Sequence, residues 1–472
     1  MSNIVVQIGQ CGNQVGFQLC DLLLNEIPVN CDTVFNQATR KARWIMVDSE
    51  PKVIGQVMTG KTTPLQTAMN PERMVYHMSG RGNNWAMGYL DAPMGGVSLH
   101  ESTLEMVRRE AESADYLRSI LSISSLAGGT GSGLGSRVHE AIREEYPLIH
   151  LLACTIQPSS SGESPLQHYN SCFALSALLD SADTIFYFQN DEIMNTILAN
   201  RQYDANVSMT NLNEYIACAL YNLLYPERSR DLALANLVQN VSPSQDCKFV
   251  EVFTSPFLFE KQPTLPFETQ WATLVENCIG QHTKFEDPRA KNFEVLSIAA
   301  SATYRGRDVL PDAEMPKKQF KSKLRTYFKP VSFLSSCQLA DTMVTERPYN
   351  LKFRIERSIT IASTRTGVIL PIKRTYESAY AKFNAGAYLH WYTKYNCGRD
   401  EFLQTFEKIQ GLVDTYEQLG MYSEGQRRST NCVNELFDSL QRQSQEEREV
   451  TVRDWVPRKE REYLAGSVQR RK

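Results

Sequence analysis

The sequence predicts an α/β fold in which a doubly wound parallel sheet is followed by a smaller α+β domain. Two observations support this prediction. In the first half of the chain, β-prone segments alternate with segments of helical periodicity, which is typical of βαβ units. A glycine-rich tract at 126–135 also separates a strand-like segment from a helix-like one, as do the phosphate-binding loops of doubly wound sheets.

The alternating segments have clear bounds. The β-prone segments are short and apolar, and they lie at 3–8, 44–48, 119–125, 149–156 and 184–189. The helix-like segments lie near 13–24, 101–113, 136–145 and 169–179. Ligands of doubly wound sheets bind in the loops that follow the carboxyl ends of the strands. We therefore expect a ligand among the loops at 9–14, 48–51, 80–85, 126–135, 159–163 and 189–191.

The chain changes character after residue 190. Residues 210–225 are strongly apolar and end before Pro226, which predicts a helix that links two domains. Short β-rich runs follow, and from residue 376 onward the chain is helix-like and increasingly charged. The predicted organisation is a sheet domain, a central helix, an intermediate α+β domain and a C-terminal helical region with a mixed-charge tail, at 1–208, 209–226, 227–371 and 372–472.

Composition argues against several classes of function. A net charge of −3 with dispersed Lys and Arg residues provides no basic surface for nucleic acid. No apolar run reaches the length of a membrane span, and the N-terminus enters a strand without a charged signal region, so we expect a cytoplasmic protein. The 11 cysteines include no C-x-x-C pair, which favours reduced thiols over a disulfide framework or a zinc site.

The glycine-rich tract, with the sequence LAGGTGSGLG, is a candidate phosphate site. Successive N–H groups of a glycine-rich turn can point at one anion, because no side chain stands between them and the ligand. The following segment predicts a helix, whose N-terminal dipole end favours negative charge. The tract and its two neighbours therefore predict a strand, a phosphate loop and a helix in that order.

A second stretch competes with this tract. Residues 55–62, GQVMTGKT, match the P-loop pattern G-x-x-x-x-G-K-[ST] in every letter. A P-loop requires a buried strand that runs directly into its first glycine, but the segment 44–48 ends well before Gly55. Residues 51–58 instead predict a short helix with Pro51 in its first turn. We favour a chance match, and a P-loop nucleotide enzyme that uses residues 55–62 stays open as an alternative.

The loops taken together carry a family resemblance. The order and spacing of motifs in the tubulin superfamily are matched by GQCGNQVG at 9–16, VDSEP at 47–51, GNNWAMGY at 82–89, AGGTGSGLG at 127–135, HYNS at 168–171, DPR at 287–289, YRG at 304–306 and LHWYT at 389–393. Because an ordered set leaves little room for chance, the chain is identified as a member of this superfamily over residues 1–420. The details are most similar to the divergent delta and zeta classes.

The resemblance implies a bound guanine nucleotide, GTP or GDP, with Mg²⁺. It places Gln10, Cys11 and Gln14 against the phosphates or the base, and Asn83 at the terminal phosphate. Glu50 aligns with the acid that holds Mg²⁺ through water. The phosphate tract contributes Ala127, Gly128, Gly129, Thr130, Gly131 and Ser132.

The resemblance also assigns the ribose and base contacts. Glu163 stands in place of the ribose-binding Asp, and Asn190 and Asn213 align with the two amides that read the guanine edge. Met209 replaces the aromatic residue that stacks on the base, so the base loses an aromatic platform. Each of these residues could instead cap a helix or close a turn, and the prediction that they bind the nucleotide rests on the whole set.

Departures from the family pattern concern hydrolysis. In the family, the nucleotide of one subunit is hydrolysed when the next subunit supplies an acid from a stretch after the central helix. Ala233 and Asn236 occupy the acidic places here, and an amide cannot act as a general base. No catalytic residue is therefore assigned, and Asp231 is the remaining candidate if the local alignment shifts.

The resemblance then implies a role in the cytoskeleton. We expect a GTP-binding structural or assembly component of specialised microtubule structures, such as centrioles, basal bodies and cilia, with little capacity to stimulate GTP hydrolysis. Its partners would be other tubulins, in longitudinal or lateral contacts. A self-polymerising GTPase of the alpha, beta or gamma kind is the alternative.

Overall fold

The computed structural model describes most of the N-terminal half of the chain and parts of the remainder. The described residues are 2–26, 33–58, 63–93, 96–160, 162, 164–199, 207–224, 234–242, 244, 246–256, 271–283, 295–306, 329–330, 339–344 and 357–421. Glu163, Asp231 and the charged tail beyond residue 421, all part of the sequence predictions, lie outside them.

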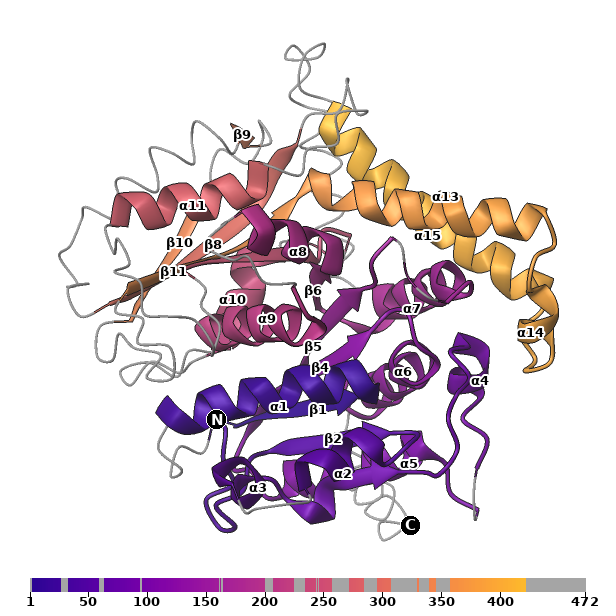
Figure 1. Cartoon of the computed structure of the whole chain (residues 1–472), viewed down its shortest axis with the longest axis horizontal. Helices are drawn as coiled ribbons and strands as arrows, with labels where there is room; N and C mark the ends of the chain where they lie inside the picture. The colour runs from indigo at the N-terminus through magenta and orange to yellow at the C-terminus, as the bar shows by residue number, and fades with distance from the viewer. Residues whose placement is uncertain are drawn as a thin grey trace, which may run out of the picture.

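A parallel sheet organises the first part of the fold (Figure 1). Its strands, in spatial order, are β3 (Met74–Tyr76), β2 (Trp44–Asp48), β1 (Ser2–Ile8), β4 (Leu117–Ser125), β5 (His150–Gln157) and β6 (Thr184–Gln189). Each neighbouring pair runs parallel. The chain order reverses between β1 and β4, which is the switch point where doubly wound sheets open a crevice for a ligand.

Helices cover both faces of this sheet, as the alternation within single strands requires. Val5 packs with α1 (Gly9–Glu26) and α9 (Met209–Leu224) in one buried cluster, whereas Ile4 and Val6 pack with α5 (Leu99–Glu112) and α6 (Gly135–Glu145) in another. Successive side chains of a strand point to opposite faces, so a strand buried on both sides is apolar throughout. This explains why β2 and β6 are apolar along most of their length, whereas β1 and β4 also bury polar residues such as Gln7 and Ser122.

The sheet continues into the second half of the chain. Strand β7 (Phe249–Ser255) pairs parallel with β6 and antiparallel with β11 (Arg357–Arg365), and β11 pairs antiparallel with β8 (Leu296–Gly306). Two further strands, β9 (Lys329–Pro330) and β10 (Leu339–Val344), pair with β8, so the described strands form one mixed sheet of 11. The predicted α/β architecture with a mixed second part is confirmed.

The remaining helices complete the layers. On the same side as α5 and α6, α13 (Ile369–Asn384) and α15 (Arg399–Met421) lie side by side and pack against α7 (Gln167–Ser181), as Figure 1 shows. The other helices are α2 (Lys52–Met58), α3 (Pro64–Ala68), α4 (Trp85–Leu90), α8 (Asn190–Ala199), α10 (Leu234–Val241), α11 (Trp271–Thr283) and α14 (Leu389–Thr393). Within the described part of the chain, no helix is long and apolar enough to span a membrane.

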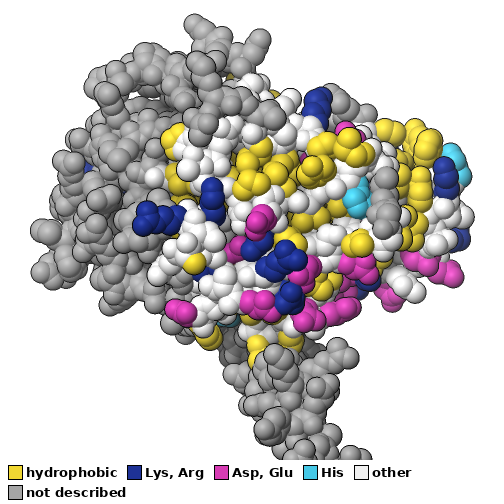
Figure 2. Space-filling model, turned by 90° about the horizontal axis from the view of Figure 1, so that it is seen from below, with side chains coloured by type: hydrophobic (Ala, Val, Ile, Leu, Met, Phe, Trp, Pro, Cys, Tyr) yellow, Lys and Arg dark blue, Asp and Glu magenta, His cyan; other side chains and the backbone are white. Residues whose placement is uncertain are grey.

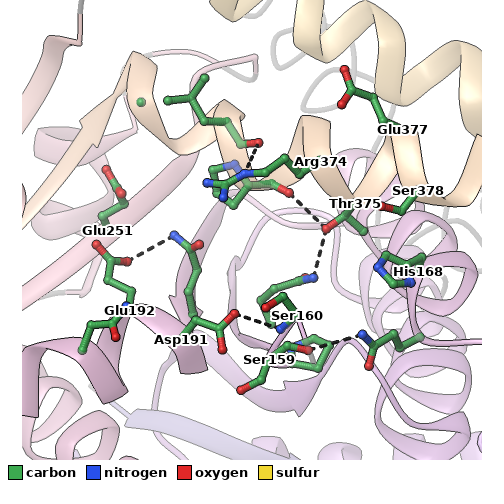
Figure 3. Close-up of a pocket in the computed structure, with 18 of the residues that line it drawn as sticks. Ser159, Ser160, His168, Asp191, Glu192, Glu251, Arg374, Thr375, Glu377 and Ser378 are labelled. Atoms are coloured by element: carbon green, nitrogen blue, oxygen red, sulfur yellow. Dashed lines mark hydrogen bonds between the residues drawn. The ribbon is translucent and has the colours of Figure 1, made fainter. Parts of the chain in front are cut away.

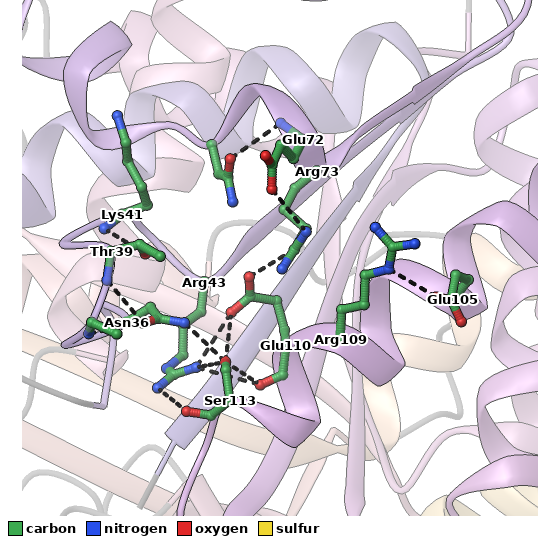
Figure 4. Close-up of polar contacts among 12 residues, drawn as sticks. Asn36, Thr39, Lys41, Arg43, Glu72, Arg73, Glu105, Arg109, Glu110 and Ser113 are labelled. Carbon is green, nitrogen blue, oxygen red and sulfur yellow. Dashed lines mark hydrogen bonds and ion pairs between the residues drawn. The ribbon is translucent and has the colours of Figure 1, made fainter.

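Charged side chains are paired on the surface and inside the first domain. Acidic and basic side chains lie next to one another on the face seen in Figure 2, rather than in separate patches. In the interior, Arg43 and Arg73 flank the carboxylate of Glu110, at 3.3 Å and 2.7 Å, and all three side chains are at least nine-tenths buried (Figure 4). This satisfied triad joins α5 to β2 and to the turn before β3, and is a structural element.

Two local predictions need correction and one is supported. The helix expected from residue 13 begins at Gly9, directly after β1, so residues 9–14 are helical rather than a loop. The tract at 126–135 is also not an open loop, because residues Gly129–Leu134 form a π-helical turn, η2, that leads into α6. In the P-loop match, Gly55 lies within helix α2, with its N–H bonded to the carbonyl of Pro51 at 2.7 Å, as the chance-match interpretation expects.

Candidate functional site

A cavity of about 510 Å³ lies at the switch point of the sheet. It is bordered by the carboxyl ends of three strands, through Ile8 of β1, Asp48 of β2 and Ser125 of β4. Because five glycines also line it, we call it the glycine-lined cavity; they are Gly9, Gly82, Gly128, Gly129 and Gly131.

The first turn of α1 forms one wall. Gly9 adopts a positive φ of 74° and allows the chain to turn from β1 into the helix without an intervening loop. Gln10, Cys11 and Gln14 line the cavity from this turn. Burial raises the pKa of the Cys11 thiol to about 12, so it stays protonated at neutral pH. The adjacent Asn13 points away and donates to the carbonyls of Gly9 and Val47 at 2.9 Å and 3.0 Å, which joins α1 to β2.

The glycine tract forms the floor, and its lack of side chains is a geometric requirement. A Cβ on Gly131 would lie 2.9 Å from the carbonyl oxygen of Ser125, and one on Gly129 would lie 2.4 Å from that of Arg81. At Gly128 the nearest atom would be Asn83 Oδ1 at 3.8 Å, so this residue faces open space. The tract therefore packs closely on its underside and presents bare backbone to the cavity.

Two carboxylates stand at the end of β2. Asp48 is buried, and its burial, with a contribution from nearby Glu50, raises the pKa of its carboxyl to about 6. The Glu50 carboxylate lies against Gly80, where a Cβ would be 2.2 Å from Oε1. Between them along the chain, the hydroxyl of Ser49 bonds that of Thr130 at 2.5 Å and ties the carboxylate end to the glycine tract. The donors gathered here are all oxygens, which suits Mg²⁺.

The loop at 80–84 covers the glycine tract. Gly82 and Asn83 both have positive φ, and Asn84 ends the loop by capping α4, with its Oδ1 accepting from the N–H of Met87. Arg81, Gly82 and Asn83 line the cavity. The opposite end is closed by α9, where Asn213 is buried and donates to Gln14 Oε1 at 3.3 Å, while the side chain of Met209 is exposed.

The structure brings together most of the predicted contacts. Lining the cavity are Gln10, Cys11, Gln14, Glu50, Asn83, Gly128, Gly129, Thr130, Gly131, Met209 and Asn213. Ala127, Ser132 and Asn190 do not line it: Ser132 is turned inward and bonds the carbonyl of Gly128, and Asn190 is buried at the start of α8. Glu163 lies outside the described residues.

Sequence reasoning missed three charged residues of the cavity. Asp48, Lys52 and Arg81 all line it, and none was assigned a role. Asp48 and Arg81 stand within the loops expected to surround a ligand, so their position was the available signal. Lys52 lies one residue beyond its loop, in the first turn of α2.

Asn170 connects the cavity to the C-terminal helices. Its Nδ2 donates to the carbonyls of Asn83 and Ala127 at 2.8 Å and 2.6 Å, and its Oδ1 accepts from the N–H of Trp85 and the hydroxyl of Tyr392 at 2.8 Å and 2.6 Å. One buried amide thus holds the loop at 80–84, the start of the glycine tract, and helix α14 in fixed relation. The HYNS and LHWYT motifs meet at this point.

A second cavity, of about 590 Å³, lies between the carboxyl ends of β5 and β6 and helix α13 (Figure 3). Glu192 and Glu251 lie on one side of it and His168 and Ser378 on the other. Among the described residues, none of the individually predicted nucleotide contacts lines it, but two of the six loops expected around the ligand contribute to its lining, through Ser159, Ser160, Gln189 and Asp191. Burial and the neighbouring Glu251 carboxylate raise the pKa of Glu192 to about 8, and Glu251 is paired with Arg365 at 2.9 Å.

The strand order and the bare glycine tract at its switch point define a doubly wound α/β protein built to hold a phosphate-bearing ligand. The sequence model of the Tubulin/FtsZ family, GTPase domain, matches residues 2–197. The chain is 27% identical to the human tubulin delta chain over 466 residues, with 88% of this chain and 99% of that one covered. It is 26% identical to the mouse tubulin delta chain, with 89% and 100% covered, and 25% identical to a tubulin beta chain of Schizophyllum commune, with 88% and 94% covered.

These comparisons agree with the motifs and with the fold. Residues 2–197 match the GTPase domain of the Tubulin/FtsZ family, and the chain as a whole is similar to the tubulin delta chains. The family's GTPase domain implies that it binds GTP or GDP.

Proposed function

We propose that the glycine-lined cavity binds the guanine nucleotide, with its phosphates over the glycine tract and the first turn of α1. This proposal rests mainly on one observation: the glycine tract and the first turn of α1 border the same cavity, at the switch point of the sheet. Both present N–H groups without side chains in between, and α1 adds the positive end of its dipole. Asn83 then approaches the terminal phosphate from the covering loop, and Thr130 contacts the phosphates from the floor.

The carboxylate end of the cavity fits Mg²⁺. Glu50 would hold the ion, with the hydroxyls of Ser49 and Thr130 close by, because hard oxygen donors are the ligands that Mg²⁺ prefers. The ion, when bound, neutralises phosphate charge next to the carboxylates. Among the described residues no group of three or more His, Cys, Asp or Glu side chains could hold a metal, so Mg²⁺ would depend on the phosphates for its remaining ligands.

The base would lie toward α9. Asn213 is held by Gln14 and has donors and acceptors for the guanine edge, and Met209 offers a flexible thioether in place of an aromatic ring. Asn190 and Glu163 complete this end in the proposal, as base and ribose contacts. The exposure of Met209 supports a loosely held base.

One experiment separates this site from the P-loop alternative. Gly131→Val would push a side chain against the backbone of Ser125, so the glycine tract must shift from its place below the phosphates, and nucleotide affinity should fall by about a hundredfold or more. Lys61→Ala should leave the affinity within about threefold, whereas a P-loop would lose binding. Titration with a fluorescent GTP analogue measures both, and loss of binding only in Lys61→Ala would refute the proposed site.

We further propose that the protein is a structural or assembly component of specialised microtubule structures, such as centrioles, basal bodies or cilia, and stimulates little GTP hydrolysis in a neighbouring tubulin. The low capacity to stimulate hydrolysis is supported by Ala233 and Asn236, which stand where the family has acids. The structural role is supported by the similarity to tubulin delta chains. The partners would be other tubulins. The alternative of a self-polymerising GTPase predicts assembly of the purified protein alone with phosphate release.

Turnover measurements test the hydrolysis proposal. Purified protein should retain bound nucleotide largely as GTP, and copolymers with ordinary tubulin should release phosphate no faster when this chain is added. Asp231→Ala should change nothing, because Asp231 is outside the position of the missing acid. A loss of turnover in Asp231→Ala would show that Asp231 supplies the acid after all.

A further inference from the structure

Arg81 is a buried cation beside the glycine tract, in the loop that covers the glycine-lined cavity. It lines the cavity although it is only 6% exposed. Its backbone and Cβ lie against Gly129, where an added Cβ would be 2.8 Å from the Arg81 Cβ. A positive charge is therefore built into the covering loop next to the bare backbone.

The guanidinium is only partly satisfied by protein groups. Its Nη2 donates to Asp91 Oδ1 at 2.8 Å, and its Nη1 reaches the carbonyl of Ser79 at 3.5 Å, the limit of a hydrogen bond. The Nε–H group is buried and has no partner. This group is the part of the guanidinium closest along the side chain to the contact with Gly129. A buried donor without an acceptor is unfavourable, so an acceptor from a ligand would remove that cost.

Asp91 holds the other end of the guanidinium in place. Its carboxylate is fully buried and also accepts from the backbone N–H of His100 at 2.7 Å and contacts the ring Nδ1 at 2.9 Å. His77 is a further titratable group near Arg81, and its burial and the Arg81 charge lower its pKa. Each Nη of Arg81 makes one hydrogen bond to the protein, whereas Nε–H makes none.

The two cations that line the cavity differ in their exposure to solvent. Its described lining has two acids, Asp48 and Glu50, and two bases, Lys52 and Arg81, so it has no net positive charge apart from the backbone dipoles. Lys52 is exposed and hydrated, whereas Arg81 is shielded from solvent. A buried charge interacts more strongly with an anion than an exposed one does, because water screens it less.

We propose that Arg81 reads the terminal phosphate of the bound nucleotide and makes the site prefer a nucleoside triphosphate over a diphosphate. Its Nε–H donates to an oxygen of that phosphate from the covering loop, and Asp91 acts as a positioning residue for the guanidinium. This inference rests on the proposed nucleotide site and adds a discriminating residue to it. In a diphosphate complex the donor would remain without a partner.

The test compares affinities for GTP and GDP in four proteins: the wild type, Arg81→Met, Arg81→Lys and Lys52→Met. Arg81→Met removes the charge and the donors and should weaken GTP binding by about tenfold to a hundredfold while GDP binding changes by less than about threefold. Arg81→Lys keeps a cation against Asp91 and should lose part of the GTP preference. Lys52→Met removes an exposed cation and should weaken both nucleotides equally and slightly.

The outcomes separate the possible roles. If Arg81 only braces the loop, GTP and GDP affinities will fall together in Arg81→Met, and the proposal is overturned. Unchanged affinities in Arg81→Met and Arg81→Lys would overturn it as well. Thermal unfolding of each variant shows whether the fold is kept, and Arg81→Lys provides the comparison if Arg81→Met is unstable. A wild type that binds neither nucleotide would refute the proposed site itself.

Discussion

The glycine-lined cavity and the second cavity differ in what lines them, and the larger of these two is not the better candidate for a ligand site. The glycine-lined cavity presents bare backbone and an unpartnered Arg81 Nε–H. In the second cavity Asp191 accepts from the N–H of Ser160 at 2.8 Å, and Gln157 donates to the Thr375 hydroxyl at 3.1 Å, although Oε1 of Gln157 has no partner. The main difference is therefore the bare backbone of the glycine tract, whose N–H groups can bond an anion without side chains in between.

The largest difference in nucleotide affinity between the two cavities should come from replacing one glycine of each by alanine. Gly129→Ala would place Cβ 2.4 Å from the Arg81 carbonyl and 2.9 Å from the Asn84 nitrogen, both backbone atoms, so the covering loop must move. We expect nucleotide affinity to fall by at least about tenfold and stability by about 1–3 kcal/mol. Nucleotide titration and thermal unfolding measure these effects.

Gly367→Ala in the second cavity is the matched control. There the new Cβ would meet a Val295 side-chain methyl at 3.0 Å, and a side chain can rotate away. Nucleotide affinity should stay within about threefold of the wild type. Equal losses of affinity in the two variants would contradict the assignment of the phosphate site to the glycine-lined cavity.

An intermediate effect is expected at Asn170, which joins the glycine-lined cavity to α14. Asn170→Ala leaves the N–H of Trp85, the hydroxyl of Tyr392 and two carbonyls without their partner. Stability should fall by about 2–4 kcal/mol, and nucleotide affinity by several-fold, because the covering loop loses an anchor. Ser171→Ala removes a single 3.3 Å bond and serves as the control. If Asn170→Ala proves as stable as Ser171→Ala, the hydrogen bonds of Asn170 contribute little to the stability of the fold.

The smallest effect on nucleotide binding should come from Glu192 in the second cavity. Its pKa is raised to about 8 by burial and by the Glu251 carboxylate, with Arg365 opposing the shift. Between pH 4.5 and about pH 8 the folded protein keeps a proton on Glu192 that the unfolded chain releases. The contribution of Glu192 to the free energy of unfolding is therefore fully present below pH 4.5 and is lost as the pH rises through about 8. Glu192→Gln cannot titrate, so its stability should depend less on pH.

Urea unfolding at pH 5 and at pH 8.5 tests this expectation. The wild type should lose about 1–3 kcal/mol more than Glu192→Gln across that interval, with nucleotide affinity unchanged in the variant. Glu377→Gln, at an exposed position of the same cavity, should keep the pH dependence of the wild type. If Glu192→Gln keeps it too, the Glu192 carboxyl is not the source of the pH dependence.

Local patterns in the sequence were sufficient for the strands and for many of the residues that line the glycine-lined cavity. Strands β2 and β6 have the predicted bounds, because a strand buried on both faces is apolar over most of its length and is easily recognised. The glycine spacing at 126–135 likewise marks a backbone that must approach its surroundings closely. Helix α1 started earlier than expected because Gly9 takes a positive φ, which apolar periodicity does not reveal.

By itself, then, the sequence determined the α/β class, the similarity to the tubulins and the four loops at 9–14, 48–51, 80–85 and 126–135 that line the glycine-lined cavity. Described residues of the two other loops expected around a ligand line the second cavity instead. Tertiary structure decided which residues of those four loops line the glycine-lined cavity, since Ser132 turns inward to the Gly128 carbonyl while Thr130 lines it. It also decided that Arg81 is buried beside Gly129 with one donor unpartnered. The physical reason is that hydrogen-bond satisfaction and burial depend on neighbours distant in the chain, and no local pattern records them.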